Sequence, residues 1–283
     1  MARFTNQAQL RYGNAIANSN IAVGEILEVL SATKTAVRKN YGRNDTITYL
    51  VSVVNAGNTA FTGLTLTDNL GAYEYNTQTL VPLRYIDGTV KYYSNGTLQA
   101  APAVIAGPPL VISGLTVPAN GSIVIAYETD VNEYAPLDVE AEIVNTATIR
   151  GTGITPVTVQ ETVSAGSEPI LTITKSISPV PVTENGTLTY TFLIQNTGNV
   201  AVEEAAASVV TDQFNPILSN LTVTFNGTVW AETTNYIYNE DTGLFSTVPG
   251  QITAPAATFV QDEQTGAWNV TPGVSTLVIT GTI

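Results

Sequence analysis

The sequence predicts an all-β protein in which one sandwich unit occurs twice. Composition is the first reason: only 12% of the 283 residues are charged, and Thr, Val, Ile, Asn and Gly are abundant, as is typical of β-sheet. The second reason is a series of short alternating segments separated by turn sequences, such as SNG (94–96) and EDTG (240–243). The third reason is an internal repeat.

The two copies of the repeat are 141 residues apart over their first halves, since Lys34 matches Lys175 and Tyr49 matches Tyr190. The matched segments are SATKTAV (31–37) with TITKSIS (172–178), NDTITYLVSVVNAGN (44–58) with NGTLTYTFLIQNTGN (185–199), LTLTDNL (64–70) with ASVVTDQF (207–214), and GSIVIAY (121–127) with VSTLVIT (274–280). Each segment alternates in the way that a half-buried strand does.

The chain opens with a strand that resembles the end of the first copy. FTNQAQLR (4–11) aligns with IVNTATIR (143–150), so that Asn6 matches Asn145 at a spacing of 139 residues. The side chains expected on the inner face of this opening strand are Phe4, Asn6, Ala8 and Leu10. The second copy has no counterpart of residues 132–150. We therefore expect the second sandwich to lack its last strand, and the N-terminus to carry a spare copy of it.

In chain order, the sequence predicts five parts with different roles. They are a donor strand (1–12), a connector or hinge (13–28), a complete Greek-key sandwich of immunoglobulin type (29–152), a linker (153–169), and a second such sandwich without its last strand (170–283). The segment VAVEEAAASVV (200–210) has helix propensity, but its place in the repeat predicts a strand.

Composition also excludes several classes of function. A net charge of −13 and a pI near 4.2 argue against binding to nucleic acid or to an anionic membrane surface. The sequence has no Cys and no His, which excludes disulfides, thiol nucleophiles, ordinary zinc sites and His-based catalysis. No cofactor or metal is expected, and acidic loops such as NEDTG (239–243) suit turns better than calcium sites.

No apolar run is long enough for membrane insertion, and MARFTNQAQL lacks the apolar core of a secretion signal. The sequence-based expectation is therefore export by an unusual route, a replaced leader, or release by lysis of the cell.

Strand alternation places three polar residues of the first copy on inner faces. They are Lys34 in the first strand, Asp68 in LTLTDNL and Asn145 in IVNTATIR, and the second copy supplies Lys175 and Asp212. Burial disfavours charge, so it favours a neutral, nucleophilic amine and a protonated acid. Such an acid can polarise the Asn carbonyl, and attack by the amine would expel ammonia and leave a Lys–Asn amide bond.

Two other arrangements remain open from the sequence alone. The first is a buried Lys–Asp pair with the Asn hydrogen-bonded nearby and no covalent bond. The second is that one of the three side chains points to solvent.

Taken together, YLVSVVNAGN, TLTDNL and VNTATI resemble the repeated Ig-like domain of unknown function found in many bacterial and archaeal surface proteins. The Lys, Asp and Asn trio also resembles that of isopeptide-bonded domains in Gram-positive pilins and adhesins. The second resemblance implies that Lys34 and Asn145 are bonded and that Asp68 is the assisting acid. In the second copy, Lys175 and Asp212 match this pattern, but no Asn follows within the domain.

These expectations combine into a structural function at the cell or spore surface. Residues 4–11 of one subunit would complete the second sandwich of the next, and Asn6 would react with Lys175 assisted by Asp212. Repeated head-to-tail addition of identical subunits makes an open, pilus-like filament or endospore appendage. The chain would not be an enzyme beyond this single-turnover self-crosslinking.

Two alternatives to an assembling subunit remain. The sequence could be a segment cut from a longer tandem array, or it could be an adhesin or S-layer stalk that presents a surface to an unidentified ligand. Candidate ligand-binding residues for that last reading are Tyr73, Tyr75, Tyr236 and Tyr238.

Overall fold

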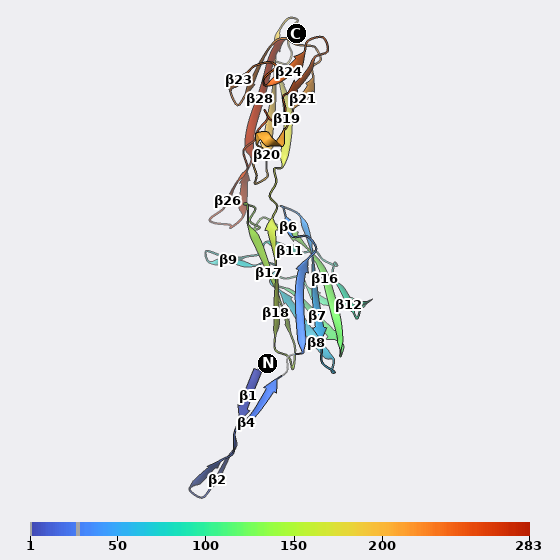
Figure 1. Cartoon of the computed structure of the whole chain (residues 1–283), viewed down its shortest axis with the longest axis vertical. Helices are drawn as coiled ribbons and strands as arrows, with labels where there is room; N and C mark the ends of the chain where they lie inside the picture. The colour runs from blue at the N-terminus through green and yellow to red at the C-terminus, as the bar shows by residue number, and fades with distance from the viewer. Residues whose placement is uncertain (1, 27–28) are drawn as a thin grey trace. The chain divides into compact units, whose positions relative to one another are not determined.

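A computed structural model describes residues 2–26 and 29–283, and the all-β prediction is confirmed over this part of the chain (Figure 1). The chain divides into two compact units. The first contains the chain up to Asn132 together with Ile143–Val163, and the second contains Glu133–Glu142 together with Ser164–Ile283. None of the described residues forms a helix long and apolar enough to cross a membrane.

The first unit consists of two facing antiparallel sheets. One sheet has the order β13-β12-β16-β7-β5, with β11 also paired to β16, and the other has the order β14-β15-β8-β17-β18-β6. The strands of the first sheet are β5 (Leu30–Ala36), β7 (Thr46–Asn55), β11 (Leu83–Tyr85), β12 (Lys91–Ser94), β13 (Thr97–Leu98) and β16 (Gly121–Val131). Those of the second are β6 (Asn40–Tyr41), β8 (Phe61–Asp68), β14 (Ala103–Ile105), β15 (Leu110–Val117), β17 (Glu142–Arg150) and β18 (Val157–Ala165). A separate hairpin joins β9 (Tyr73–Tyr75) to β10 (Gln78–Leu80).

The core of the first unit follows directly from strand alternation. Every second residue of β7 is buried, and so is every second residue of β17, because successive side chains point to opposite faces of a sheet. Tyr49 and Val51 of β7 therefore point toward the same interior as Leu66 of β8 and Ile149 of β17. Lys34, Asp68 and Asn145 also lie inside, so the inward direction predicted for these three side chains is confirmed.

The second unit repeats the first sheet closely and the second sheet only in part. Its larger sheet has the order β19-β20-β28-β22-β23, and its smaller sheet has the order β21-β25-β24. The strands are β19 (Leu171–Ser178), β20 (Thr187–Asn196), β21 (Thr211–Gln213), β22 (Ser219–Phe225), β23 (Thr228–Trp230), β24 (Tyr236–Asn239), β25 (Leu244–Thr247) and β28 (Gly273–Thr282). A hairpin joins β26 (Thr258–Gln261) to β27 (Trp268–Thr271), and η1 (Glu204–Ala206) is a short 3₁₀ turn.

The strand registers of the two units correspond. Asn55 lies opposite Gly121 in the first unit, and Asn196 lies opposite Gly273 in the second. The smaller sheet differs between the units: β8 lies between β15 and β17, whereas β21, among the described residues, pairs with β25 alone. The edge of β21 that corresponds to the β17 side of β8 is therefore open.

The N-terminal segment pairs with itself as a long hairpin. β1 (Ala2–Asn6) pairs with β4 (Ala22–Ile26), and β2 (Gln9–Tyr12) pairs with β3 (Ala15–Asn18). All residues from 4 to 23 are exposed. The expected donor strand therefore lies on a solvated ribbon within the described chain (Figure 1).

Three segments differ from the sequence-based expectation. The connector (13–28) contains β3 and β4, and the linker (153–169) contains β18, because VTVQETVSA is rich in β-branched residues. The strand expected over 200–210 is wrong: this stretch holds the 3₁₀ turn, and only Thr211–Gln213 is a strand. A three-alanine run with low strand propensity, beside an edge without a partner, accounts for the shortening.

Candidate cross-linking sites and the open sheet edge

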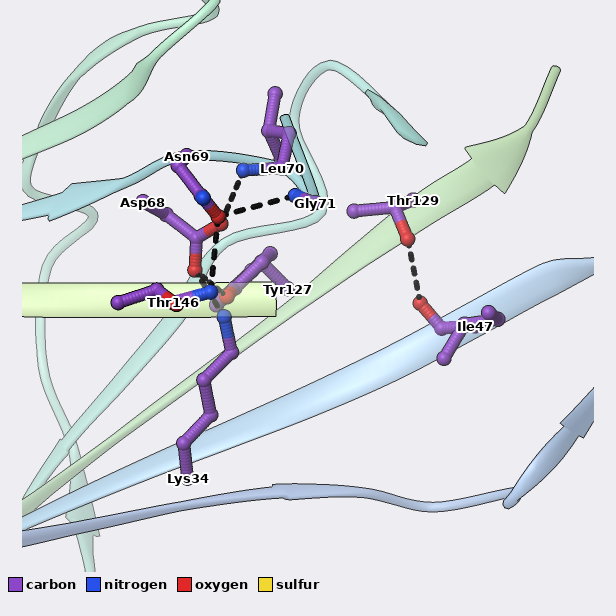
Figure 2. A network of polar contacts seen from close by, with 9 residues as sticks. All are labelled: Lys34, Ile47, Asp68, Asn69, Leu70, Gly71, Tyr127, Thr129 and Thr146. Carbon is purple, nitrogen blue, oxygen red and sulfur yellow. Dashed lines mark hydrogen bonds and ion pairs between the residues drawn. The ribbon is translucent and has the colours of Figure 1, made fainter. Parts of the chain in front are cut away.

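Lys34 and Asp68 form an ion pair in the interior of the first unit. Lys34 comes from β5 in one sheet, Asp68 comes from the end of β8 in the other, and Lys34 Nζ lies 2.5 Å from Asp68 Oδ2. Both side chains have an exposed fraction of 0%. Figure 2 shows Lys34 extending from its strand toward Asp68 and Tyr127.

The Asp68 carboxylate is held by two further donors. The Leu70 amide donates to Oδ1 at 2.8 Å, and the Tyr127 hydroxyl donates to Oδ2. The neighbouring Asn69 accepts a hydrogen bond from the amide of Thr146 at 2.8 Å, which ties the end of β8 to β17. These contacts fix the carboxylate next to the strand that carries Asn145 (Figure 2).

Asn145 is buried, and over the described residues neither its amide nitrogen nor its carbonyl oxygen has a hydrogen-bond partner of good geometry. The amide is nevertheless close enough to the hydroxyls of Tyr49 and Tyr127 to lower their pKa values. Burial is the larger effect, and it raises both pKa values well above the ordinary tyrosine value. An unsatisfied buried amide costs roughly 1–3 kcal/mol, so its presence beside a Lys–Asp pair requires an explanation.

Burial lowers the pKa of Lys34 from 10.5 to about 8, against the opposing charge and hydrogen bond of Asp68. A larger share of this amine is therefore neutral near physiological pH than of an exposed lysine. Lys34 Nζ also lies 4.8 Å from the centre of the Tyr49 ring and 5.9 Å from that of Tyr127. The amine, the acid and the amide of Asn145 thus share one interior that is bounded by the same two tyrosines.

The matched residues of the second unit are paired but exposed. Lys175 Nζ contacts Asp212 Oδ2, yet the exposed fractions of the two side chains are 38% and 17%. Lys175 also lies 4.2 Å from the centre of the Tyr190 ring, as Lys34 lies over Tyr49. Burial and the charge of Asp212 raise the pKa of Tyr190. Ile279 lies opposite Tyr190 where Tyr127 lies opposite Tyr49, so Asp212 lacks the hydroxyl donor that Asp68 has.

The exposure of Lys175 is part of a larger bare surface. All eight residues of β19 are exposed, and they include Leu171, Ile173 and Ile177. In the matched strand β5, Lys34 and Ala36 are buried. The second unit thus presents apolar side chains, an ion pair and an open strand edge at the place where β17 lies in the first unit.

Asn6 belongs to the first unit and Lys175 to the second. Asn6 lies at the end of β1 opposite Ala22, and the strand expected over 4–11 is interrupted at Gln7 and Ala8. The four residues expected to face inward, Phe4, Asn6, Ala8 and Leu10, are all exposed. Their roles as donor-strand residues and the cross-linking role of Asn6 remain predictions.

Sequence reasoning missed the two tyrosines that line the first site. Tyr49 could have been found from the repeat, because the second copy has Tyr190 at the matched position. Tyr127 has no tyrosine counterpart in the second copy. The sequence match of 121–127 with 274–280 pairs it with Thr280, and the strand registers correct this match by one residue, to Ile279. Of the tyrosines considered for ligand binding, Tyr236 and Tyr238 are buried core residues, and the Tyr238 hydroxyl donates to the Leu218 carbonyl at 2.8 Å. That part of the ligand-binding prediction is wrong.

No protein-family model matches this chain, and no curated protein sequence matches it either. Solved structures with some likeness include the pilus backbone RrgB of Streptococcus pneumoniae (13% identity, TM-score 0.35, 86% of this chain and 55% of that one). BcpA, the major pilin subunit of Bacillus cereus, matches at 13% identity and a TM-score of 0.36, over 96% of this chain and 73% of that one. AvmM, which catalyses macrocyclization in alchivemycin A biosynthesis, matches at 14% identity and a TM-score of 0.30, over 51% of this chain and 92% of that one.

This chain spans about half the length of the pneumococcal protein. Scores of this size, shared by pilins and an enzyme, do not decide function. The functional argument therefore rests on the chain's own geometry.

Proposed function

We propose that this chain is a structural subunit of an extracellular filament, pilus-like or an endospore appendage, that assembles head-to-tail with identical subunits. One observation carries the proposal: the same Lys–Asp pair is sealed inside the first unit and exposed in the second. The strand that seals it in the first unit is β17, and residues 4–11 align with the sequence of β17.

The register of β17 specifies how the donor strand would dock. Ala147 lies opposite Asp68 and Thr148 lies opposite Thr67. Moved by the repeat spacing, these pairs become Ala8 opposite Asp212 and Gln9 opposite Thr211. Leu10 then lies opposite Val210, and the inner face of the donor strand covers the bare apolar surface of the second unit.

Burial supplies the driving force for this docking. Phe4 and Leu10 are large apolar side chains that are exposed in the free hairpin. Complete burial of such a side chain contributes about 1.5–3 kcal/mol. The incoming backbone would also satisfy the open edge of β21, as in other cases of β-strand addition. Because the donor and the acceptor lie on different parts of the subunit, the contact is heterologous, and head-to-tail addition that does not close into a ring gives an open polymer.

Docking would also bring an Asn beside the Lys–Asp pair of the second unit, as Asn145 belongs with Lys34 and Asp68 in the first. We propose one reaction for both sites, described here for the first unit. The neutral Lys34 amine attacks the side-chain carbonyl carbon of Asn145, the new C–N bond forms, the bond to the amide nitrogen breaks, and ammonia leaves. Asp68 passes the proton from the attacking amine to the departing nitrogen, so no external reactant is needed. We propose the same reaction between Lys175 of one subunit and Asn6 of the next, with Asp212 as the acid.

The test is fibre formation by full-length variants. Leu10→Asp places a charge on the inner face of the donor strand, and Gln9→Asp places the same charge on its outer face. We expect electron microscopy to show fibres for the parent and for Gln9→Asp but not for Leu10→Asp, whose charge would be buried without a partner. Equal fibre yield from both variants, or the absence of fibres from the parent, would refute the donor-strand proposal.

A further inference from the structure

We infer that the donor is a two-stranded hairpin, in which residues 4–11 enter the second unit of a neighbouring subunit while β1 stays paired with β4. This inference rests on the proposed function and extends it. In the first unit the sheet continues from β8 through β17 to β18 and then β6, so the second unit is open at two consecutive strand positions. A single donor strand would fill one of them and leave a new open edge.

The β1–β4 part of the N-terminal hairpin has the register of the β17–β18 hairpin. The Ala165 amide donates to the Ala141 carbonyl at 2.7 Å, and the Thr148 and Thr158 hydroxyls lie 3.1 Å apart. Moved back by the 139-residue spacing between Asn6 and Asn145, the first of these pairs becomes Ala2 and Ile26. Ala2 and Ile26 are opposite each other in β1 and β4. The β1–β4 part of the N-terminal hairpin therefore copies the pairing of the hairpin that completes the first unit. Beyond the interruption at Gln7 and Ala8 the register shifts by one residue, because Gln9 lies opposite Asn18 and not opposite Ser19, the counterpart of Thr158.

Side-chain sizes in the two hairpins compensate across the strands. By the same shift, Ile143 and Val163 correspond to Phe4 and Gly24, which are partners in β1 and β4. Ile143 and Val163 are both buried in the first unit. The ring of Phe4 lies over Gly24 so closely that an added Cβ would be 2.2 Å from Cζ. One large ring over a glycine thus replaces two aliphatic side chains of middle size.

The second unit also lacks the cover that β18 gives to the first. Glu161 of β18 accepts a hydrogen bond from the Ala36 amide at 3.1 Å and pairs with Lys39. Ala36 is 7% exposed, whereas the matched residue Ile177 in β19 is 45% exposed. By the 139-residue shift, residue 22 of β4 corresponds to Glu161. In the docked hairpin, β4 would therefore cover the end of β19 that contains Ile177.

A disulfide that locks β1 to β4 distinguishes hairpin donation from single-strand donation. Thr5 and Val23 are opposite each other and exposed, and they lie on the face of the hairpin that would point away from the core. The chain has no cysteine, so Thr5→Cys/Val23→Cys introduces the only possible disulfide. Each single variant is the matched control. The monomer is oxidised at low concentration, and its intramolecular bond is verified by mass before assembly is started with and without reductant.

If the hairpin enters as a unit, oxidised and reduced protein give the same fibre yield as the parent. Fibres from the reduced protein, but none from the oxidised protein, would overturn the hairpin inference and retain single-strand donation, since β1 would have to leave β4. Failure of the parent, the single variants and the reduced double variant to form fibres would overturn both the hairpin inference and the proposed function.

Discussion

The buried amine of Lys34 gives the account a quantitative consequence for stability. The perturbation is a change of pH from 8 to 10 in Asn145→Ala, a variant that cannot form the covalent bond and so keeps Lys34 free. Burial lowers the pKa of Lys34 from 10.5 to about 8. Between these two values the unfolded chain binds more protons than the folded chain, and stability therefore rises with pH.

The magnitude follows from the two pKa values. At pH 8 the amine is half protonated in the folded state and almost fully protonated in the unfolded state. At pH 10 it is almost fully deprotonated in the folded state and still about three-quarters protonated in the unfolded state, so the difference is larger there. Integration over this interval gives a gain of about 2 kcal/mol in the free energy of unfolding. The raised pKa values of Tyr49 and Tyr127 act in the opposite direction, but only where free tyrosine ionises, near and above pH 10.

The assay is chemical denaturation of full-length Asn145→Ala at several pH values, with Lys34→Met/Asn145→Ala as the control. Exposed lysines titrate alike in the folded and unfolded states, so the difference between the two variants isolates Lys34. We expect the free energy of unfolding to rise with pH in the first variant relative to the second. Parallel pH dependence in both would show that Lys34 is not a desolvated amine, and the proposed attack would lose its nucleophile.

Three further substitutions test the site and the donor. Tyr127→Phe removes a hydrogen-bond donor from Asp68 and should cost about 1 kcal/mol of stability. It should also slow the loss of one ammonia, which intact-mass measurement follows over time; an unchanged rate would show that Tyr127 takes no part in the reaction. Asn6→Ala should still give fibres, but they should separate into monomers on boiling in denaturant, and a persisting ladder would exclude Asn6 as the bonded residue. Gly24→Val should reduce assembly because its side chain collides with Phe4, and Phe4→Ile/Gly24→Val should restore it; failure of the double variant would contradict the compensation of sizes.

The fold and the first site could be predicted because the alternation of residues along a strand indicates which side chains are buried. Lys34, Asp68 and Asn145 each lie at the inward phase of an apolar strand, and a one-residue error would have moved all their neighbours to solvent. The repeat added the match between Lys34 and Lys175, and thus the comparison between a closed and an open site.

Other features could not be predicted from the pattern alone. The segment that forms β18 lies between the last strand of one copy and the first strand of the next, and that position predicted a linker. The pairing of β1 with β4 is a long-range register that single-strand periodicity does not encode. Tyr127 acts on Asp68 from the facing sheet, and only the packing of the two sheets brings its hydroxyl to the carboxylate.

The most direct test of donation between subunits is a disulfide between two different single-cysteine variants. Gln9 and Thr211 are exposed, and the proposed register places them opposite each other, at a separation that a disulfide can span. Mixing Gln9→Cys with Thr211→Cys under mild oxidation should give the mixed dimer, with the two labelled peptides joined in the mass spectrum. Absence of that mixed dimer, in a sample where fibres form, would contradict the account.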